Sequence, residues 1–259
     1  MRVTACPSIV QITPRTGTSK AKRQSDKMSF FPALNMICMK KGIRIIPLIC
    51  CLALACACKK GKTQEEEGFK YEAVFLGDSI TANWIREDRG HPDFFKEHNY
   101  LGMGYSGKTT SYMKNLFQLS VIDKHPRQAV ILGGTNDIAQ NDGKYVPIEE
   151  IRDNIASMAE AATSKGIRVV LCSVTPSRGF SWSSSVSHPE VTIVELNKLI
   201  KALAEEKGYA YADYHSALVD ADGGLPSNLS TDGTHPNKDA YTIMESIILP
   251  ILQELPAQE

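Results

Sequence analysis

Two short segments that lie far apart in the sequence carry side chains suited to nucleophilic catalysis. Ser79 follows an apolar run and a glycine, and it begins a predicted helix. A helix amino terminus offers unpaired amides and a partial positive charge, so a serine there either caps the helix or acts as a nucleophile. Asp232 and His235 lie in one predicted turn, in which a carboxylate can orient an imidazole that acts as a base. The same turn is also typical of a loop histidine beside a capping aspartate.

Three further positions follow predicted strands and could complete such a site. The amide side chain of Asn136, in Gly134-Thr135-Asn136, either donates to a developing negative charge or stabilises a turn by a hydrogen bond to the backbone. Gly104 follows the short run Tyr100-Leu101 in a predicted glycine-rich turn, where its amide can approach a substrate closely. Trp182 lies in a loop after another strand, where it either lines a pocket or packs against the domain.

The elements that would position these residues alternate between strand and helix from residue 70 onward. Short apolar runs predict strands at 73–76, 129–132 and 169–172, with a weaker one at 209–211. Amphipathic spacing predicts helices at 79–84, 109–121, 148–164, 191–204 and 237–252, the last kinked or ended early by Pro250. Gly233 interrupts any helix before Pro236, which suits the first position of the last helix. This alternation predicts a parallel sheet with helices on both faces and with functional groups at the carboxyl ends of the strands.

Four short motifs, taken together and in order, resemble those of the SGNH or GDSL hydrolase superfamily. They are Gly77-Asp78-Ser79-Ile80, Gly104 within Gly-Tyr-Ser-Gly-Lys-Thr-Thr, Gly134-Thr135-Asn136-Asp137 and Asp232-Gly233-Thr234-His235-Pro236. The resemblance spans residues 71–252, and Gly104 fits the second motif better than Gly102 because Ser-Gly-x-Thr-Thr follows it. It implies an α/β fold, namely a flavodoxin-like three-layer α/β/α sandwich with a five-stranded parallel sheet. Asp78 is structural in that family.

The resemblance also implies a role for each residue of the site. Ser79 is then the nucleophile, His235 the general base, and Asp232 the residue that orients the base. The amides of Ser79 and Gly104 and the side chain of Asn136 form the oxyanion hole. No cofactor or metal is implied. The five other histidines lack metal-ligand spacing: His91, His98, His125, His188 and His215.

A phosphate-binding loop is the alternative interpretation of residues 102–109, which satisfy the pattern G-x-x-x-x-G-K-[ST] between a strand and a helix. An enzyme of that kind also needs an acidic residue that organises magnesium at the end of a later apolar strand. The later strands end in Leu132-Gly133-Gly134 and Cys172-Ser173-Val174 instead. The four hydrolase motifs explain more residues, so the sequence favours the hydrolase.

The segment at 39–58 is typical of an export signal. A basic start precedes thirteen apolar residues, 45–57, which are too few to span a hydrocarbon layer of about 30 Å. Ala-Leu-Ala-Cys and Ala-Cys-Ala-Cys, which end at Cys56 and Cys58, resemble the lipoprotein cleavage site, which implies lipidation of one of these cysteines. A plain signal peptide and a buried helix are the alternatives. We therefore expect a gene-model extension or disorder at 1–38, a signal peptide at 39–58, a tether at 59–69 and the hydrolase domain at 70–259.

Charge and cysteine content divide the chain of 259 residues in the same way. Residues 1–58 hold nine Lys or Arg and one Asp, which leaves 20 basic and 28 acidic residues in the remainder. A body this acidic argues against a nucleic acid as partner. Six of the seven cysteines precede residue 59, so Cys172 has no partner for an intrachain disulfide in the body. It is either a small buried hydrophobe or a thiol nucleophile.

These observations predict an exported bacterial lipoprotein with serine esterase activity, facing the periplasm or anchored at the outer membrane or cell surface. Its acyl group should be short, because the body shows no long apolar segment that could form a lid at a lipid interface. Its partners are then a small-molecule or glycan ester, such as O-acetylated carbohydrate, and the membrane. The alternatives are a thioesterase or lysophospholipase, or a glycan-binding lipoprotein without turnover. The intact Ser79, Asp232 and His235 argue against the last of these.

Overall fold

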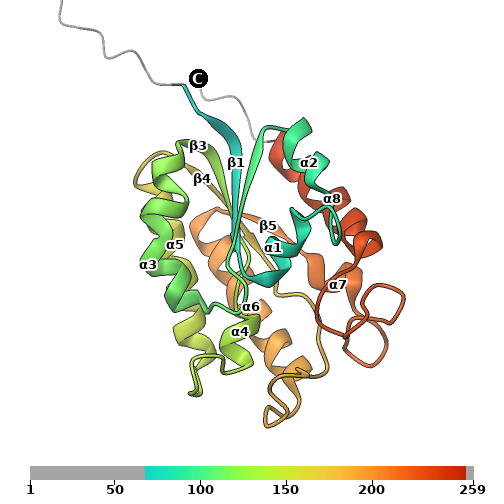
Figure 1. The fold of residues 1–259 in the computed structure, drawn as a ribbon. Helices are drawn as coiled ribbons and strands as arrows, with labels where there is room; N and C mark the ends of the chain where they lie inside the picture. Colours follow the sequence, from blue (N-terminus) through green and yellow to red (C-terminus); the bar gives the residue numbers. More distant parts are fainter. Residues whose placement is uncertain (1–67, 255–259) are drawn as a thin grey trace, which may run out of the picture. The chain divides into compact units, whose positions relative to one another are not determined.

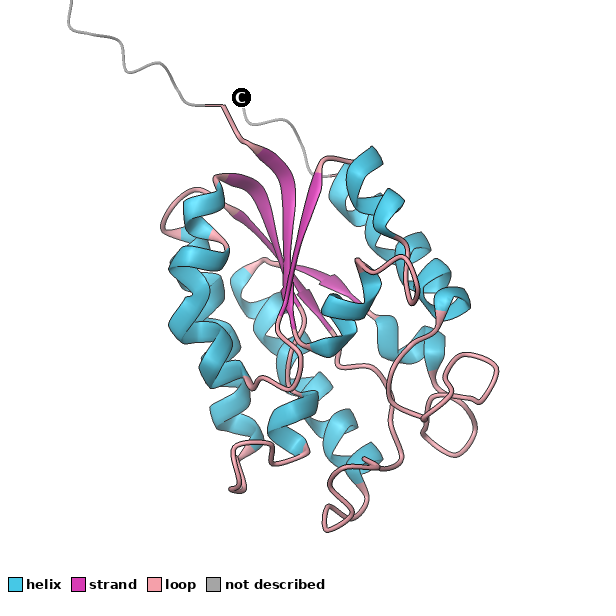
Figure 2. Ribbon diagram, viewed as in Figure 1, coloured by secondary structure: helices cyan, strands magenta, loops and turns pink. Residues whose placement is uncertain are grey.

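One parallel β-sheet, covered by helices on both faces, forms residues 68–254, which are the part of the chain that the computed structural model describes (Figures 1 and 2). The strand order is β2-β1-β3-β4-β5, and every neighbouring pair is parallel. The strands are β1 (Tyr71–Gly77), β2 (Tyr100–Gly104), β3 (Pro126–Ile131), β4 (Arg168–Cys172) and β5 (Ala210–Ala212). The predicted α/β/α sandwich with five parallel strands is confirmed.

The helices form the two outer layers. They are α1 (Ser79–Trp84), α2 (Pro92–Glu97), α3 (Thr110–Ser120), the 3-10 helix η1 (Ile122–Lys124), α4 (Thr135–Ile138), α5 (Ile148–Thr163), α6 (Pro189–Lys207), α7 (Tyr214–Leu218) and α8 (Lys238–Gln253). In Figure 1, α3 and α5 lie on one side of the sheet, and α2 and α8 lie on the other.

The sheet separates two apolar cores, because its strands bury side chains on both faces. In β1, Val74 and Leu76 pack in the core that contains the apolar residues of α3, α5 and α6. Ala73 and Phe75 pack in the other core, with residues of α1, α2, α7 and α8. A strand that is buried on both faces reads as a continuous apolar run, which explains why the sequence identifies these strands clearly.

An aromatic cluster around Trp84 fixes α1, which has only six residues and would be unstable by itself. The Trp84 ring stacks on Tyr241 of α8 at 5.2 Å between centroids, and its Nε1 donates to Glu245 at 2.9 Å. The Tyr241 hydroxyl in turn donates to the carbonyl of Ile80 at 2.7 Å. These contacts hold α1 against α8, and with it the segment that begins at Ser79.

Several helices differ from the sequence prediction. The short helices α2, α4 and α7 were not predicted, and α6 is longer at both ends. Pro250 does not end α8, which continues to Gln253, and the amide of Glu254 donates to the Pro250 carbonyl at 2.8 Å. A proline this close to the helix end removes a single backbone hydrogen bond, and the burial of Ile248 and Leu252 on either side offsets that loss.

The predicted glycine-rich turn at Gly102 and Gly104 is wrong, because both residues belong to β2. A Cβ on Gly102 would lie 2.3 Å from Ile85 Cγ2. The missing side chain therefore lets this edge strand approach the end of α1, and the chain turns only after Gly104.

The predicted place of Pro236 is also wrong. Pro236 pairs with Ser230 in an isolated antiparallel bridge, and α8 begins two residues later. Asn237 caps the helix instead, with its Oδ1 accepting from the amide of Ala240 at 3.1 Å. A side-chain cap accepts a hydrogen bond from an otherwise unpaired amide of the first turn, which a proline side chain cannot do, so Asn237 is the stronger start signal of the two.

The expected gene-model extension, the signal peptide with Cys56 and Cys58, and nearly all of the tether lie outside the described residues. In the described part of the hydrolase domain, the first strand, β1, begins at Tyr71. Among residues 68–254, no helix combines the length and the hydropathy needed to cross a membrane.

Candidate active site

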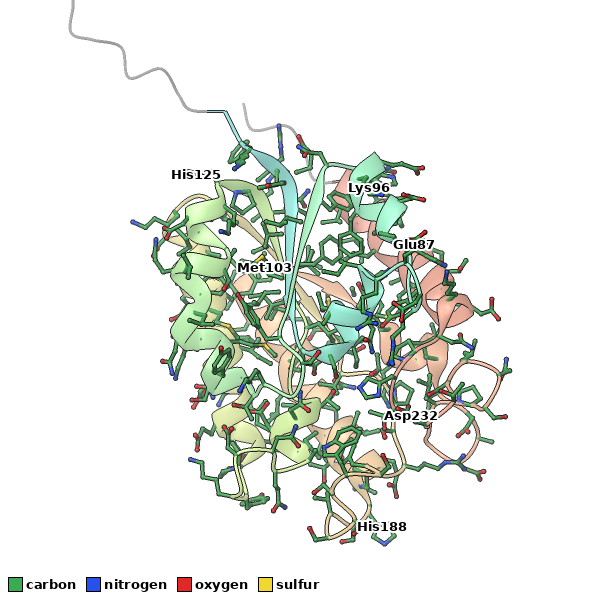
Figure 3. The ribbon with its side chains drawn as sticks, viewed as in Figure 1. Glu87, Lys96, Met103, His125, His188 and Asp232 are labelled. Carbon is green, nitrogen blue, oxygen red and sulfur yellow. The ribbon has the colours of Figure 1, made fainter. Side chains whose placement is uncertain are left out.

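Ser79, His235 and Asp232 form one hydrogen-bonded chain, although 156 residues separate the serine from the histidine. Ser79 Oγ lies 2.9 Å from His235 Nε2, and His235 Nδ1 lies 2.7 Å from Asp232 Oδ2. A neutral imidazole that donates from Nδ1 to the carboxylate leaves Nε2 to accept from the serine hydroxyl. This arrangement suits a nucleophile, a base and an orienting carboxylate. Figure 3 shows Asp232 far from His125 and Lys96, which lie at the other end of the domain.

The turn that carries Asp232 and His235 is built around the carboxylate. Asp232 Oδ1 accepts from the amides of Thr234 at 3.0 Å and His235 at 2.8 Å. Gly233 between them has a φ of +76°, which favours glycine. Burial raises the pKa of Asp232, but the hydrogen bonds from the His235 amide and ring and from the Thr234 amide outweigh burial and lower the pKa to about 2. The carboxylate is therefore ionised at neutral pH, where it can stabilise a protonated imidazole.

Ser79 is the first residue of α1, close after the carboxyl end of β1. Asp78 caps this helix, with its Oδ1 accepting from the amide of Ile80 at 2.9 Å, and burial raises the pKa of Asp78 to about 6. A Cβ on Gly77 would lie 2.1 Å from Thr81 Oγ1, so the sharp change from strand to helix requires glycine. Because Asp78 caps the helix, the Ser79 hydroxyl is left to interact with the histidine.

Asn136 reaches the site from α4, which follows β3. Gly134, directly before this helix, has a φ of +128°, and a Cβ there would lie 2.8 Å from Leu196 Cδ2. Asn136 is only 2% exposed; its Nδ2 donates to the Lys108 carbonyl at 3.0 Å, and its Oδ1 accepts from Asn141 Nδ2 at 2.8 Å. A primary amide carries two N–H groups, so the second Nδ2–H is available to a substrate oxygen.

The neighbouring Asp137 ties α4 to the start of α3. Its carboxylate accepts from the amide of Thr110 at 2.9 Å and from Thr110 Oγ1 at 2.7 Å. Burial raises the pKa of Asp137 to about 6, against the lowering effect of these two hydrogen bonds. Asp137 therefore supports the helix that carries Asn136.

Four of the predicted site residues meet at one cavity of about 280 Å³, and Asp232 and Gly104 are not among its lining residues. The cavity is lined by Ser79, Gly107, Asn136, Asn141, Trp182 and His235. Trp182 thus lines the pocket, which is one of the two alternatives that the sequence leaves open; it is 44% exposed, and its ring centroid lies 5.8 Å from that of His235. Sequence reasoning missed Gly107 and Asn141. The only signal for them was their place in polar loops that follow predicted strands, which many residues share.

Gly104 ends β2 beside Gly77 in the register of the sheet. The amide of Tyr105 donates to the Gly77 carbonyl at 2.8 Å, and because amides alternate in direction along a strand, the amide of Gly104 points away from β1. A Cβ on Gly104 would lie 2.1 Å from the amide nitrogen of Ala82, so α1 packs here only against glycine. Gly104 is not among the residues that line the cavity, and its role as an oxyanion donor stays a prediction.

The segment that matches the phosphate-loop pattern contributes to the same site. Its first three residues, 102–104, belong to β2, and the Lys108 carbonyl accepts the hydrogen bond from Asn136. Lys108 Nζ lies 4.8 Å from the centre of the Tyr112 ring, a cation–π contact that occupies the ammonium group. Within residues 68–254, no group of three or more His, Cys, Asp or Glu side chains could hold a metal ion.

Cys172 is a buried hydrophobe in β4. It is 1% exposed and packs in the core that contains Trp84 and Tyr214. Burial raises the pKa of the Cys172 thiol to about 12, so the reactive thiolate is not formed at neutral pH.

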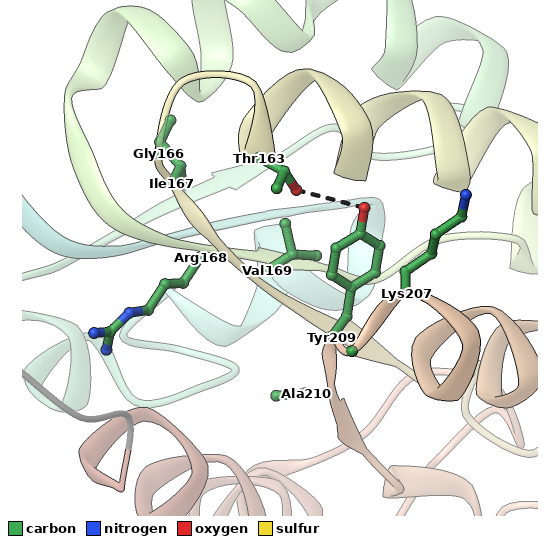
Figure 4. A pocket seen from close by; sticks show the side chains of 9 residues that line it. Thr163, Gly166, Ile167, Arg168, Val169, Lys207, Tyr209 and Ala210 are labelled. Atoms are coloured by element: carbon green, nitrogen blue, oxygen red, sulfur yellow. Dashed lines mark hydrogen bonds between the residues drawn. The ribbon is translucent and has the colours of Figure 1, made fainter. Parts of the chain in front are cut away.

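A second cavity, of about 340 Å³, lies at the amino ends of β4 and β5 (Figure 4). Thr163, Lys207 and Tyr209 line it, and Thr163 Oγ1 donates to Tyr209 Oη at 3.4 Å. Its lining residues, all in the described part of the chain, include no serine, cysteine or histidine. This second cavity therefore lacks the linked serine, histidine and carboxylate that are found at Ser79.

Comparisons with known proteins show the family and the fold of the chain. Residues 75–243 match the GDSL-like lipase/acylhydrolase family. The crystal structure of a GDSL-like lipase from Bacteroides thetaiotaomicron is similar with a TM-score of 0.68 and 37% identity, over 70% of this chain and 87% of that chain. An acetylxylan esterase from Geobacillus stearothermophilus has a TM-score of 0.57 over 71% of this chain and 95% of that one, and at 20% identity it shows the fold alone.

A curated relative is the uncharacterized lipoprotein YqeF of Bacillus subtilis. It is 32% identical over 130 residues, which are 42% of this chain. The match spans about half, 51%, of that protein's length.

Proposed function

The chain belongs to the GDSL-like lipase/acylhydrolase family, and from this premise we propose that it is a serine esterase that cleaves short acyl esters through an acyl-enzyme intermediate. The observation that carries the proposal is the contact of 2.9 Å between Ser79 Oγ and His235 Nε2. A serine hydroxyl is a weak nucleophile unless a base takes its proton, and this contact provides the base.

The proposed reaction has two halves. In the first, Ser79 Oγ attacks the ester carbonyl while His235 Nε2 takes the serine proton, and the Asp232 carboxylate stabilises the imidazolium that forms. The amides of Ser79 and Gly104 and the side chain of Asn136 would donate to the oxyanion. His235 then protonates the leaving alcohol. In the second half, a water molecule activated by the same histidine releases the acyl group and restores the serine.

We propose short acyl groups, and O-acetyl groups on carbohydrate in particular, as the substrates. One feature supports the choice of a short acyl group: the cavity at Ser79 measures only about 280 Å³. The acetylxylan esterase with the same fold acts on an acetylated polysaccharide by name, but its low identity transfers no substrate to this chain. A thioesterase or lysophospholipase would use the same three residues and remains the competing proposal.

A panel of p-nitrophenyl esters from acetate to palmitate, together with acetylated oligosaccharides, tests the substrate class. We expect kcat/KM to be highest for acetate and to fall as the acyl chain lengthens, with acetate released from the glycans. Ser79→Ala is the matched control for background hydrolysis. Preference for palmitate, a lysophospholipid or an acyl thioester would establish the competing activity, and no turnover of any ester would favour a binding protein.

Asn136→Ala tests the proposed oxyanion hole. Removal of one such donor lowers kcat by about 10²–10³, and we expect a loss in this range. KM should change far less, because the oxyanion develops only near the transition state. Steady-state kinetics on p-nitrophenyl acetate separates the two constants. A loss that falls mainly on KM would make Asn136 a substrate-binding residue instead.

We also propose that the enzyme is anchored by a lipid on Cys56 or Cys58, after export through the signal at 39–58. The sequence supports this, and one similar protein is named a lipoprotein. Globomycin, which blocks cleavage of lipoprotein signals, should cause a larger precursor to accumulate. The single variants Cys56→Ser and Cys58→Ser identify the modified residue, because only one of them should abolish a diacylated amino terminus in mass spectra. An unmodified terminus in a secreted form would exclude the anchor but not the esterase.

A further inference from the structure

Asn141 joins three loops around the cavity. Its Nδ2 donates to Asn136 Oδ1 at 2.8 Å and to the carbonyl of Gly107 at 3.2 Å. Its Oδ1 accepts from Trp182 Nε1 at 2.9 Å. All four residues line the cavity at Ser79. One side-chain amide therefore connects the proposed oxyanion donor Asn136 to the aromatic side chain of Trp182.

The backbone after α4 is folded so that Asn141 reaches this place. Gln140 has a φ of +58°, a left-handed conformation that is uncommon for a residue with a side chain. The amide of Asn141 then returns to the carbonyl of Asn136 at 3.0 Å. The next residue, Asp142, accepts from Thr109 Oγ1 at 2.7 Å, which ties the turn to the start of α3. A left-handed residue of this type costs conformational energy, so the surrounding contacts must hold the turn.

The hydrogen bond from Asn141 determines which end of the Asn136 amide faces the cavity. The two ends of a primary amide are similar in size, but only the nitrogen end can donate to an oxyanion. Because Asn141 donates to Asn136 Oδ1, the Asn136 nitrogen is turned toward the Lys108 carbonyl. A flipped Asn136 would place oxygen against the Lys108 carbonyl and nitrogen against Asn141 Nδ2, and both contacts would be repulsive.

Asn141 also fixes Trp182, which forms one wall of the cavity. The loop of Trp182 is anchored by Phe180, which is 3% exposed and whose ring centroid lies 5.3 Å from the indole. The indole itself is 44% exposed, so its orientation depends on the bond from Nε1 to Asn141 and on the contact with the His235 ring. The indole is thereby held at a set position relative to the nucleophile and Asn136.

We propose that Asn141 is a positioning residue for the oxyanion donor Asn136, and that Trp182, held by Asn141, limits the length of the acyl chain. The proposal rests on the proposed esterase function and assigns specificity within that same site. It predicts two separable effects: loss of the Asn141 amide lowers kcat, and loss of the indole lengthens the preferred acyl chain.

A double-mutant cycle tests the positioning role. Asn141→Leu keeps the approximate size of the side chain and removes every hydrogen bond, and we expect kcat on p-nitrophenyl acetate to fall about tenfold, with little change in KM, since the donor is misdirected rather than removed. In an Asn136→Ala background the same change should cost less than about twofold, because residues that act through one another are not additive. Tyr145→Ala is the matched control, since Tyr145 lies in the same loop and is 70% exposed. Equal losses in both backgrounds would overturn the positioning role.

Acyl-chain profiles of Trp182→Ala and Trp182→Phe test the limit on length. We expect the ratio of kcat/KM for octanoate to that for acetate to rise at least about tenfold in Trp182→Ala, since several methylene groups gain a place to bind. Trp182→Phe retains a ring but cannot donate to Asn141, so its ratio should be intermediate. An unchanged ratio would overturn the proposal, as would a rise in KM confined to acetylated oligosaccharides, which would make Trp182 a sugar-stacking residue. A wild-type enzyme without turnover on any ester would instead contradict the esterase function itself.

Discussion

Ser79→Ala should lower kcat on p-nitrophenyl acetate by about 10⁶, the loss found when the nucleophile of a well-characterised serine protease is removed. The fold should be unaffected. The Ser79 hydroxyl bonds to the half-buried His235 ring, which water can reach in the variant, and α1 is held by Trp84 and Tyr241 rather than by the serine. We expect the free energy of unfolding to change by no more than about 0.5 kcal/mol. Steady-state kinetics and thermal unfolding measure the two effects.

Labelling with a fluorophosphonate identifies the nucleophile directly. One adduct should form in the wild-type protein, at Ser79, and none in Ser79→Ala. Ser106 is the matched control, because it is exposed in the β2–α3 loop, one residue before Gly107 of the cavity lining. Ser106→Ala should retain both labelling and turnover. An adduct on Ser106, or on the buried Ser173 that follows β4, would contradict the assignment of Ser79 as the nucleophile.

The strands and the longer helices could be predicted because their apolar patterns are local properties of the sequence. Residues 73–76 form a continuous apolar run because Val74 and Phe75 face two different cores. The helix α4 has four residues, too few for any periodic pattern, and its position depends on Asp137 and the amide of Thr110, which lies on another helix. Such a contact between distant segments cannot be recognised in one sequence.

The residues that would carry the chemistry could be identified for a different reason. Each stands in a motif in which the local backbone geometry requires particular neighbouring residues. Gly77 before Ser79 and Gly233 before His235 are two such neighbours. Asn141 has no such neighbours. It reaches the cavity through the left-handed Gln140 and through its bond to Trp182, which is 41 residues away, so neither spacing nor residue type marks it.

The second large effect concerns the pair formed by Asp232 and His235. His235→Ala should reduce turnover almost as far as Ser79→Ala, because the serine then has no base. Asp232→Asn should cost less than that; in a protease the corresponding change lowered kcat by about 10⁴. Asparagine keeps an oxygen that can accept from the amides of Thr234 and His235, as Oδ1 does now, so the turn should persist. Only the Oδ2 contact to the ring is altered.

That single change reverses the tautomer. An asparagine Nδ2 beside His235 Nδ1 favours a ring that accepts at Nδ1 and carries its proton on Nε2, where it cannot take the proton of Ser79. Because the pKa of Asp232 is lowered to about 2, its carboxylate stays ionised well below neutral pH, whereas Asp78 and Asp137, whose pKa values burial raises to about 6, lose their protons within the assayed range. Activity should rise with pH in the wild type, because a base that takes the proton of Ser79 must itself be unprotonated. Profiles of both variants on p-nitrophenyl acetate test this. A flat wild-type profile from about pH 5 to 9, together with full activity of His235→Ala, would exclude a serine–histidine mechanism.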